Sequence, residues 1–229
     1  MTLTDRQKQI LNSTVLEYID SAQPISSQVL EEKDDFGVSQ ATIRNEMQLL
    51  EDKGFLAKPH ISSGRVPTDK GYRFFVDDVS AEKEECKTAI PELEKEIQDH
   101  VKSIQLMTKQ LAFLSSNLAF VYLSQENILW KEGWESLLEE PEFRDREYTT
   151  KLTRFLRDFE SVIADIQPES VEIYIGRENP FSRVRDFSIV MAGCLFHDNQ
   201  WGLVSIIGPK RMAYQKNIAL MNSLNKLFV

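Results

Sequence analysis

An amphipathic helix followed at once by two short apolar segments is the feature that most restricts the fold of this chain. It lies in residues 37–67, GVSQATIRNEMQLLEDKGFLAKPHISSGRVP. Ser39 is a suitable N-cap for the helix and Gly54 a suitable stop, and the apolar residues between them recur at helical spacing, namely Ile43, Met47 and Leu50. FLAKPH and RVPT then predict two short strands joined by ISSG.

Two more helices are predicted upstream of this stretch. TDRQKQILNSTVLEYIDSA has helical apolar spacing with Thr4 as a possible N-cap, and SSQVLEEKD follows after Pro24, which disfavours a helical Gln23. DKGYRFFVDDV predicts a helix that leads out of the region. Three helices followed by a β-hairpin is the element order of a winged helix-turn-helix, which we assign to residues 1–79.

Residues 80–123 are charged and carry a heptad pattern of apolar residues. One series starts at Ile90 and the other at Leu93, and together they run for about four heptads, broken by His100. The pattern predicts a long linker helix that needs a partner for its apolar seam. That partner is either a second copy of the chain, in a coiled coil, or the chain's own C-terminal domain. The seam residues for dimerisation are Leu93, Ile97, Ile104, Met107, Leu111, Leu114 and Leu118.

Residues 124–229 predict a small α+β domain with an antiparallel sheet. REYTTKLTRFLRDFESVIADI is helical in pattern, and SVEIYIG, FSIVMAGCLF and WGLVSIIG predict strands. The last segment, from PKRMAY to the end, predicts a closing amphipathic helix. The chain as a whole is therefore expected to be α+β, with three parts: 1–79, 80–123 and 124–229.

The helix at residues 39–53 has side chains suited to reading base edges in the major groove. Arginine can fork onto guanine, asparagine can pair with adenine, and an alanine methyl can contact thymine. The candidate recognition residues are Ser39, Gln40, Ala41, Thr42, Arg44 and Asn45.

Charge limits where DNA could bind. The chain has a net charge of −9, and residues 1–79 hold 9 Lys and Arg against 13 Asp and Glu. Residues 58–73 are an exception, because Asp69 alone opposes four basic residues, Lys58, Arg65, Lys70 and Arg73. These four are candidate contacts of a wing with the DNA backbone, although an ordinary solvated basic loop is the alternative.

The same blocks resemble the N-terminal domain of the HrcA family of heat-inducible transcription repressors. LTDRQKQIL, GVSQATIRNEMQLLEDKGFL and PHISSGRVPTDKGYRFFVD carry the resemblance over residues 3–77, and GWESLLEEPEF, IYIGRENP and GLVSIIGPKRMAYQKNI resemble blocks of its C-terminal half. By motif position, the resemblance implies wing contacts at His60, Ser62, Ser63 and Arg65. It also implies a winged helix joined to a GAF-like domain that carries an inserted dimerising domain.

The resemblance further implies a homodimer on an inverted-repeat DNA operator upstream of chaperone genes, derepression by heat, and a chaperonin as a possible partner. This chain is shorter than typical members, and the missing part is expected between LAFVYL and GWESLL. The family's mode of dimerisation is therefore in doubt here, and the heptad seam is the candidate replacement.

Other candidate sites have simpler explanations. His60, His100 and His197 have no metal-binding spacing, and no catalytic motif is found, so we expect no metal, no cofactor and no enzyme. Lys210 and Arg211 could bind an anion, but a strand-to-helix turn with Pro209 in the first helical turn is the favoured explanation. Cys194 is expected in the core rather than as a redox sensor. No signal peptide or spanning helix is predicted, so we expect no membrane association and a cytoplasmic location.

The sequence therefore predicts a DNA-binding repressor of heat-shock genes that acts as a homodimer. The alternative is a protein-interaction module that uses the winged helix and the coiled coil without specific DNA binding. The net negative charge of residues 1–79 favours the alternative, whereas Arg44, Asn45 and Arg65 among suitable polar neighbours favour DNA.

Overall fold

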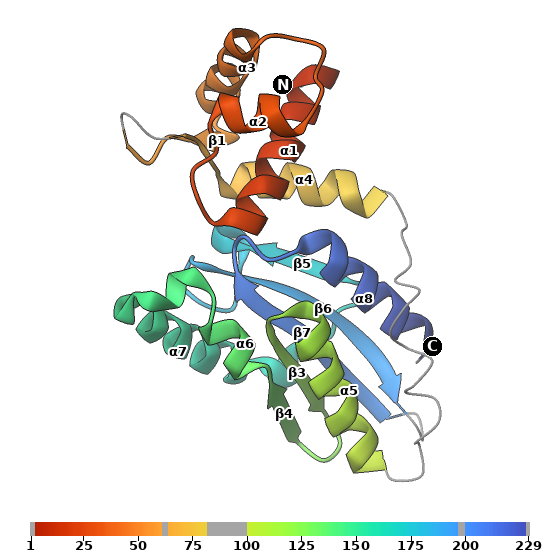
Figure 1. Ribbon diagram of the computed structural model, residues 1–229. Helices are drawn as coiled ribbons and strands as arrows, with labels where there is room; N and C mark the ends of the chain where they lie inside the picture. The colour runs from red at the N-terminus through yellow and green to blue at the C-terminus, as the bar shows by residue number, and fades with distance from the viewer. Residues whose placement is uncertain (1–2, 61–63, 82–99, 197–199, 228–229) are drawn as a thin grey trace. The chain divides into compact units, whose positions relative to one another are not determined.

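The structure is a computed structural model that describes residues 3–60, 64–81, 100–196 and 200–227 (Figure 1). Its contacts divide the chain into two compact units, Met1–Ala81 and Glu82–Val229. We call them the N-terminal and the C-terminal unit and describe each by itself.

The N-terminal unit consists of helices and one short antiparallel strand pair. Its elements in order are α1 (Asp5–Ser21), α2 (Ser27–Lys33), α3 (Gln40–Asp52), β1 (Leu56–Ala57), β2 (Val66–Pro67) and α4 (Asp69–Ala81). In the strand pair, Leu56 lies opposite Pro67 and Ala57 opposite Val66. Ile25, between α1 and α2, adds an isolated antiparallel bridge to Arg65.

Local signals in the sequence set the ends of these helices. Thr4 and Gln7 form a capping box at the start of α1, and the side chains of Ser26 and Ser39 cap α2 and α3. Gly54 follows α3 with φ +77°, a left-handed conformation that a side chain would strain. The chain therefore leaves α3 and enters β1 within a few residues.

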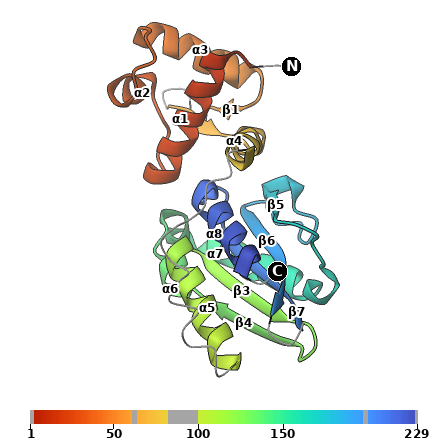
Figure 2. The same cartoon turned by 90° about the vertical axis from the view of Figure 1, so that its right-hand side faces the viewer.

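A single apolar core holds the N-terminal unit together. Each helix buries one side, and the buried apolar residues among those described are Leu3, Ile10, Leu11, Val15, Ile25, Leu30, Ile43, Met47, Leu50, Phe55, Leu56, Tyr72, Phe75 and Val76. Figure 2 shows α1, α2 and α3 gathered beside β1.

The C-terminal unit is α+β, with one antiparallel sheet of order β4-β3-β7-β6-β5. The strands are β3 (Leu118–Leu123), β4 (Ile128–Glu132), β5 (Glu172–Ile175), β6 (Phe187–Phe196) and β7 (Gln200–Pro209). The helices are α5 (His100–Ser115), α6 (Trp134–Leu138), α7 (Arg146–Glu160) and α8 (Tyr214–Leu227), with 3-10 turns at Pro141–Arg144, Ile163–Asp165 and Gly176–Glu178. This arrangement is consistent with a GAF-like domain.

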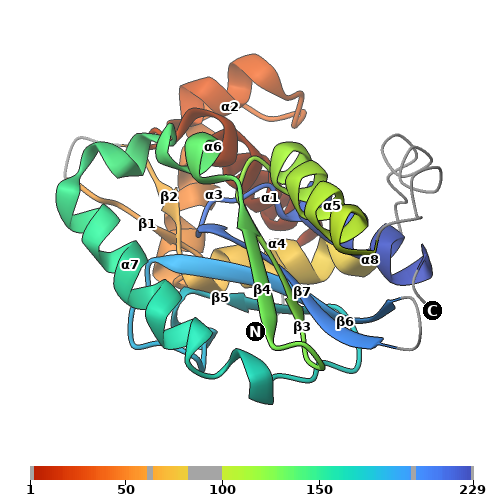
Figure 3. The same ribbon diagram turned by 90° about the horizontal axis from the view of Figure 1, so that it is seen from below.

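Helices cover both faces of the sheet, as Figure 3 shows. Alternate residues of β3, β6 and β7, such as Phe120, Ile189 and Leu203, pack in one apolar cluster with Leu152, Phe155 and Phe159 of α7. The other face is covered by α5 and α8, which lie side by side in Figure 2. Every residue of β3 is buried, as expected for a strand covered on both faces.

The heptad seam was predicted to be a dimer interface, but its described residues pack within their own unit. In α5 the seam residues Ile104, Met107 and Leu111 are buried, and the helix packs on β3, β4, β7 and α8 of its own unit. The helix ends at Ser115, so Leu118 lies in β3 instead of continuing the seam. Packing on the chain's own sheet is therefore the alternative that the structure supports for these residues.

The other seam residues are Leu93, Ile97 and Leu114. Leu114 is half-buried, and Leu93 and Ile97 lie outside the described residues.

Because α5 and β3 are part of the sheet unit, the predicted boundary between residues 123 and 124 is also wrong. Strand β4 and helix α6 were not predicted from the sequence. Among the described helices, none combines the length and apolar character that crossing a membrane requires.

Asn217 is a polar residue in the apolar interior of the C-terminal unit. It lies on α8, has no exposed surface, and both its side-chain oxygen and its nitrogen lack a hydrogen-bond partner. A buried amide without partners loses its hydration with no compensation, which destabilises the folded state. The nearby polar pair on α8 and β6 is different, because the hydroxyl groups of Tyr214 and Ser188 are 2.7 Å apart and bond to each other.

We predict that Asn217→Leu stabilises the C-terminal unit by about 1–3 kcal/mol, the usual cost of an unsatisfied buried group. Denaturant unfolding followed by tryptophan fluorescence measures this unit alone, because Trp130, Trp134 and Trp201 all lie in it. Asn117→Leu is the matched control and should destabilise the unit, because Asn117 is also buried but donates to the carbonyl oxygen of Ser115 at 2.6 Å. A lower midpoint for Asn217→Leu would contradict the prediction.

Candidate nucleic-acid interface

Helix α3 buries one side and exposes the other. Ile43, Met47 and Leu50 are completely buried, and they follow the spacing of one helix face. The opposite side carries small and polar exposed residues at positions three and four apart, namely Ala41, Arg44, Asn45 and Gln48. Packing of the buried face therefore holds these side chains pointing away from the core.

Five of the six predicted recognition residues are exposed, namely Ser39, Gln40, Ala41, Arg44 and Asn45, and Thr42 is half-buried. Two of the six, Ser39 and Thr42, are engaged at the start of the helix. The Ser39 hydroxyl accepts the Thr42 amide at 3.4 Å and lies 3.2 Å from the Thr42 hydroxyl. Ser39 and Thr42 thus form the cap that starts α3, which limits their freedom to contact a base.

An acidic residue that the sequence analysis overlooked lies at the start of α3. The Gln40 amide donates to a Glu31 carboxylate oxygen at 3.0 Å. A carboxylate at a helix N-terminus interacts favourably with the helix dipole and takes the place that a phosphate would take. The acidic run at positions 31, 32, 34 and 35 was the available signal in the sequence.

The hairpin β1–β2 carries the predicted wing residues to different surroundings. Lys58 and His60 are exposed, whereas Ser62 and Ser63 lie outside the described residues. Arg65 is almost completely buried, with the side chain bonded to Glu51 and Gln48 of α3. The prediction that Arg65 contacts DNA is therefore not supported by its position, because its guanidinium group is used inside the unit.

The two basic residues after the hairpin also have partners in the unit. The Lys70 ammonium donates to the carbonyl oxygen of Lys53 at 2.8 Å and lies 4.2 Å from the centre of the Phe55 ring. Lys53 is the C-cap of α3, so Lys70 places positive charge at the negative end of that helix. Arg73 forms an ion pair with Asp77 one turn along α4, at 3.6 Å. Of the four predicted basic contacts, Lys58 is the most available to a partner.

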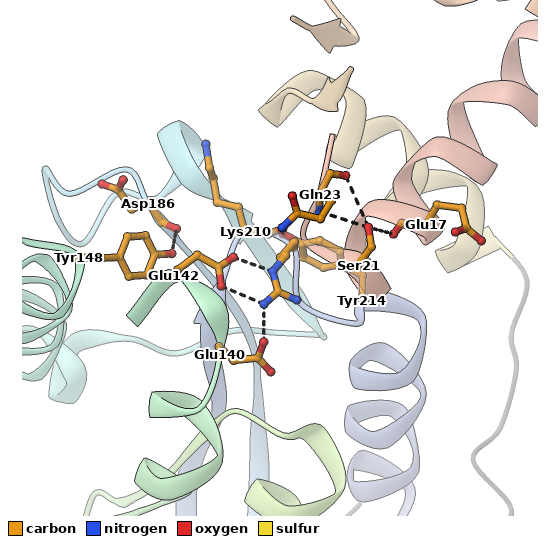
Figure 4. Close-up of polar contacts among 10 residues, drawn as sticks. Glu17, Ser21, Gln23, Glu140, Glu142, Tyr148, Asp186, Lys210 and Tyr214 are labelled. Atoms are coloured by element: carbon orange, nitrogen blue, oxygen red, sulfur yellow. Dashed lines mark hydrogen bonds and ion pairs between the residues drawn. The ribbon is translucent and has the colours of Figure 1, made fainter. Parts of the chain in front are cut away.

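The possible anion site at Lys210 and Arg211 is explained by charge pairing. The Arg211 guanidinium bonds Glu142 through two nitrogens, at 2.6 and 2.9 Å, and also bonds Glu140 (Figure 4). Burial alone lowers the pKa of Arg211, but the hydrogen bonds and charges of Glu142 and Glu140 raise it further than burial lowers it. Two carboxylates already pair with this cation. The Arg211 side chain therefore links the 3-10 turn of Pro141–Arg144 to the β7–α8 connection.

Two further side chains of the same unit, Cys194 and Tyr148, are held within the fold. Cys194 is buried in β6, and burial raises the pKa of its thiol to about 12, so the thiol stays protonated as expected of a core residue. Tyr148 donates its hydroxyl to the carbonyl oxygen of Asp186 at 3.0 Å (Figure 4). In the ranges that the structure describes, no three His, Cys, Asp or Glu side chains gather as a metal site would require.

Comparison with known proteins places the chain in a family. A family model described as HrcA protein C terminal domain matches residues 79–218. A heat-inducible transcription repressor HrcA from Thermoanaerobacter pseudethanolicus is 26% identical over 330 aligned positions, which cover 99% of this chain and 96% of that protein. The same repressor from Caldanaerobacter subterraneus subsp. tengcongensis is 27% identical with the same coverage.

The alignments also bear on the length of the chain. Each spans 330 positions, far more than the 229 residues present here, so the matched blocks are separated by long gaps in this chain. A crystal structure of a hypothetical protein has a similar fold, with a TM-score of 0.78, 21% identity and 99% coverage of both chains. The family model covers more than half of the sequence, and this chain belongs to the HrcA family.

Proposed function

We propose that this chain is a sequence-specific DNA-binding transcriptional repressor of heat-shock genes. In this proposal it binds an inverted-repeat operator as a homodimer and leaves it on heat stress. The relatives are named heat-inducible transcription repressors rather than enzymes, which supports a repressor role. A repressor of genomic operators would act in the cytoplasm.

The exposed side of α3 is the observation that carries the proposal. We take the N-terminal unit as a winged helix-turn-helix, with α3 as the recognition helix and β1–β2 as the wing. Ala41, Arg44 and Asn45 then face the major groove, with Gln40 at the helix start. Lys58 and His60 would lie beside the DNA backbone, and Ser39 and Thr42 would hold the end of the helix.

A homodimer is proposed from the symmetry of the operator. Two half-sites related by a twofold axis are bound by two copies related by the same axis. We do not propose the α5 residues Ile104, Met107 and Leu111 as the interface, because they are buried against their own unit. A chaperonin as helper remains part of the proposal only through the family resemblance.

The competing proposal is a protein-interaction module, and one observation favours it. Glu31 occupies the N-terminus of α3, and Glu32, Asp34 and Asp35 follow it. Negative charge beside the recognition helix repels phosphate and would suit a basic protein surface. Salt dependence separates the two proposals, because phosphate contacts make log K fall steeply with log salt.

We predict that the full chain prefers an inverted-repeat duplex from upstream of the host's chaperonin genes over a scrambled duplex by roughly a thousandfold or more. Fluorescence anisotropy in a salt series measures both affinities. Equal and weak binding to the two duplexes would contradict DNA recognition and favour the protein-interaction module.

Single substitutions should separate base reading from backbone contact. Asn45→Ala should weaken operator binding by about 1–3 kcal/mol and relax preference at one base pair, since it removes a bidentate base contact. Lys58→Ala should weaken binding to all sequences and lower the salt slope by about one. Lys109→Ala, which removes an exposed lysine from α5, is the charge control and should change neither quantity.

We propose that heat releases the protein from the operator by unfolding the C-terminal unit. A loss of a few kcal/mol is a large part of a domain's stability, so heating can unfold this unit. Asn217→Leu should then raise the temperature at which purified protein leaves the operator, by about 2–4 °C per kcal/mol of added stability. The measurement is anisotropy during heating without any chaperonin. An unchanged release temperature in a stabilised variant would show that heat acts elsewhere.

A further inference from the structure

Arg65 connects the wing to the recognition helix. We propose that Arg65 is a positioning residue, which with Glu51 and Gln48 holds the β1–β2 hairpin at a set angle to α3, so that both can reach one duplex. The effect on operator binding rests on the proposed DNA-binding function. The contacts of Arg65 within the N-terminal unit do not depend on DNA.

The side chain of Arg65 makes two bonds to the same helix. Its Nε donates to Glu51 Oε2 at 3.1 Å and its Nη2 donates to Gln48 Oε1 at 2.8 Å, while 8% of the residue is exposed. The two acceptors are three residues apart on α3 and therefore lie on neighbouring turns. A planar guanidinium group suits this pair of acceptors, and an ammonium group, a single point of charge, does not.

Gln48 is itself held in the orientation that Arg65 needs. Its Nε2 donates to Asp52 Oδ1 at 3.0 Å, which directs its Oε1 towards the arginine. Both ends of the amide are therefore used, and the reverse orientation would place its NH₂ group against a guanidinium donor. The arrangement is a chain of charge-assisted hydrogen bonds along the last turns of α3.

The main chain of Arg65 is fixed to a second part of the unit. Its amide donates to the carbonyl oxygen of Ile25 at 2.8 Å, and the Ile25 amide donates back at 2.9 Å. Gly64 permits this approach, because a Cβ there would lie 2.4 Å from the Ile25 oxygen. The start of β2 is thus tied to the α1–α2 connection by backbone and to α3 by the Arg65 side chain.

These ties add to the burial of Leu56 and Pro67 and to the Thr68–Phe55 backbone bond, which also hold the short hairpin to the unit. Each strand is two residues long, and an isolated two-stranded hairpin is at best marginally stable in water. Lys58 follows β1 directly, so its distance from the recognition helix depends on how β1–β2 is held. Loss of the Arg65 contacts would loosen the hairpin and weaken any contact that Lys58 makes.

The direction in which one substitution changes operator affinity separates a positioning role from a simple effect of charge. Glu51→Gln removes a negative charge from a DNA-binding unit, and charge alone would make operator binding tighter. The positioning role predicts weaker binding, on the order of fivefold to tenfold, because the Glu51–Arg65 ion pair is replaced by a weaker hydrogen bond to a neutral amide. Glu32→Gln is the control with the same charge change. Glu32 is an exposed residue of α2 that accepts a hydrogen bond from Gln28, so this variant should leave binding unchanged or slightly tighter.

A double variant separates positioning from direct contact by Arg65. If Arg65 acts through the wing, Arg65→Met and Lys58→Ala each lower the salt slope by about one, and the double variant lowers it no further. If Arg65 itself binds a phosphate, the double variant lowers the slope by about two. Tighter binding by Glu51→Gln, or a slope lowered by two, would overturn the inference.

Hydrogen exchange decides the inference without DNA. In the full chain, Glu51→Gln should speed exchange of the Ile25 and Arg65 amides by about tenfold or more and leave the Val15 amide in the middle of α1 unchanged. Equal acceleration at Val15 would indicate general destabilisation and overturn the inference, as would no acceleration at Ile25 and Arg65. Failure of the wild-type chain to prefer the operator would instead remove the proposed function, and the exchange result would still decide the role of Arg65.

Discussion

Burial of Ile43, Met47 and Leu50 along one side of α3 is the interaction on which the proposed interface depends. A helix advances by about 100° per residue, so this burial also decides which residues face outward. Ala41, Arg44 and Asn45 face outward because they lie on the side of α3 away from its buried residues. Gly54 then ends the helix in a left-handed conformation and lets β1 begin close to it. Helix α3 and the β1–β2 hairpin are thus neighbours because of packing and one backbone conformation.

Positive charge near α3 is mostly used inside the N-terminal unit. Arg65 bonds to the helix at Glu51 and Gln48, and Lys70 bonds to its last turn at Lys53. Glu31 lies at the first turn. A surface with few free cations gives little non-specific attraction to DNA, so affinity would depend more on base contacts and on the wing's position. In this account the unit gains selectivity for sequence and loses general affinity.

Periodicity predicted the individual elements well because it reports burial of one side. It identified α3, with Ser39 as its N-cap, and the strands β5, β6 and β7 of the sheet. It did not identify what covers a buried side: the same heptad spacing describes a coiled coil and the packing of α5 on its own sheet. Nor do residue types reveal pairing across the fold, so Arg65 resembled a DNA contact until its partners on α3 were known. Side-chain partners distant in sequence account for most of the differences at the candidate interface.

The central claim is that the exposed side of α3 reads DNA, and mapping the surface that changes on binding tests it most directly. We would record amide and side-chain NMR shifts of the full chain as the inverted-repeat duplex is added. The account predicts the largest changes at residues 40–45, with changes also at Lys58, and small changes for the buried residues of α1. Changes confined to α4 or to the C-terminal unit, with residues 40–45 unaffected, would contradict it.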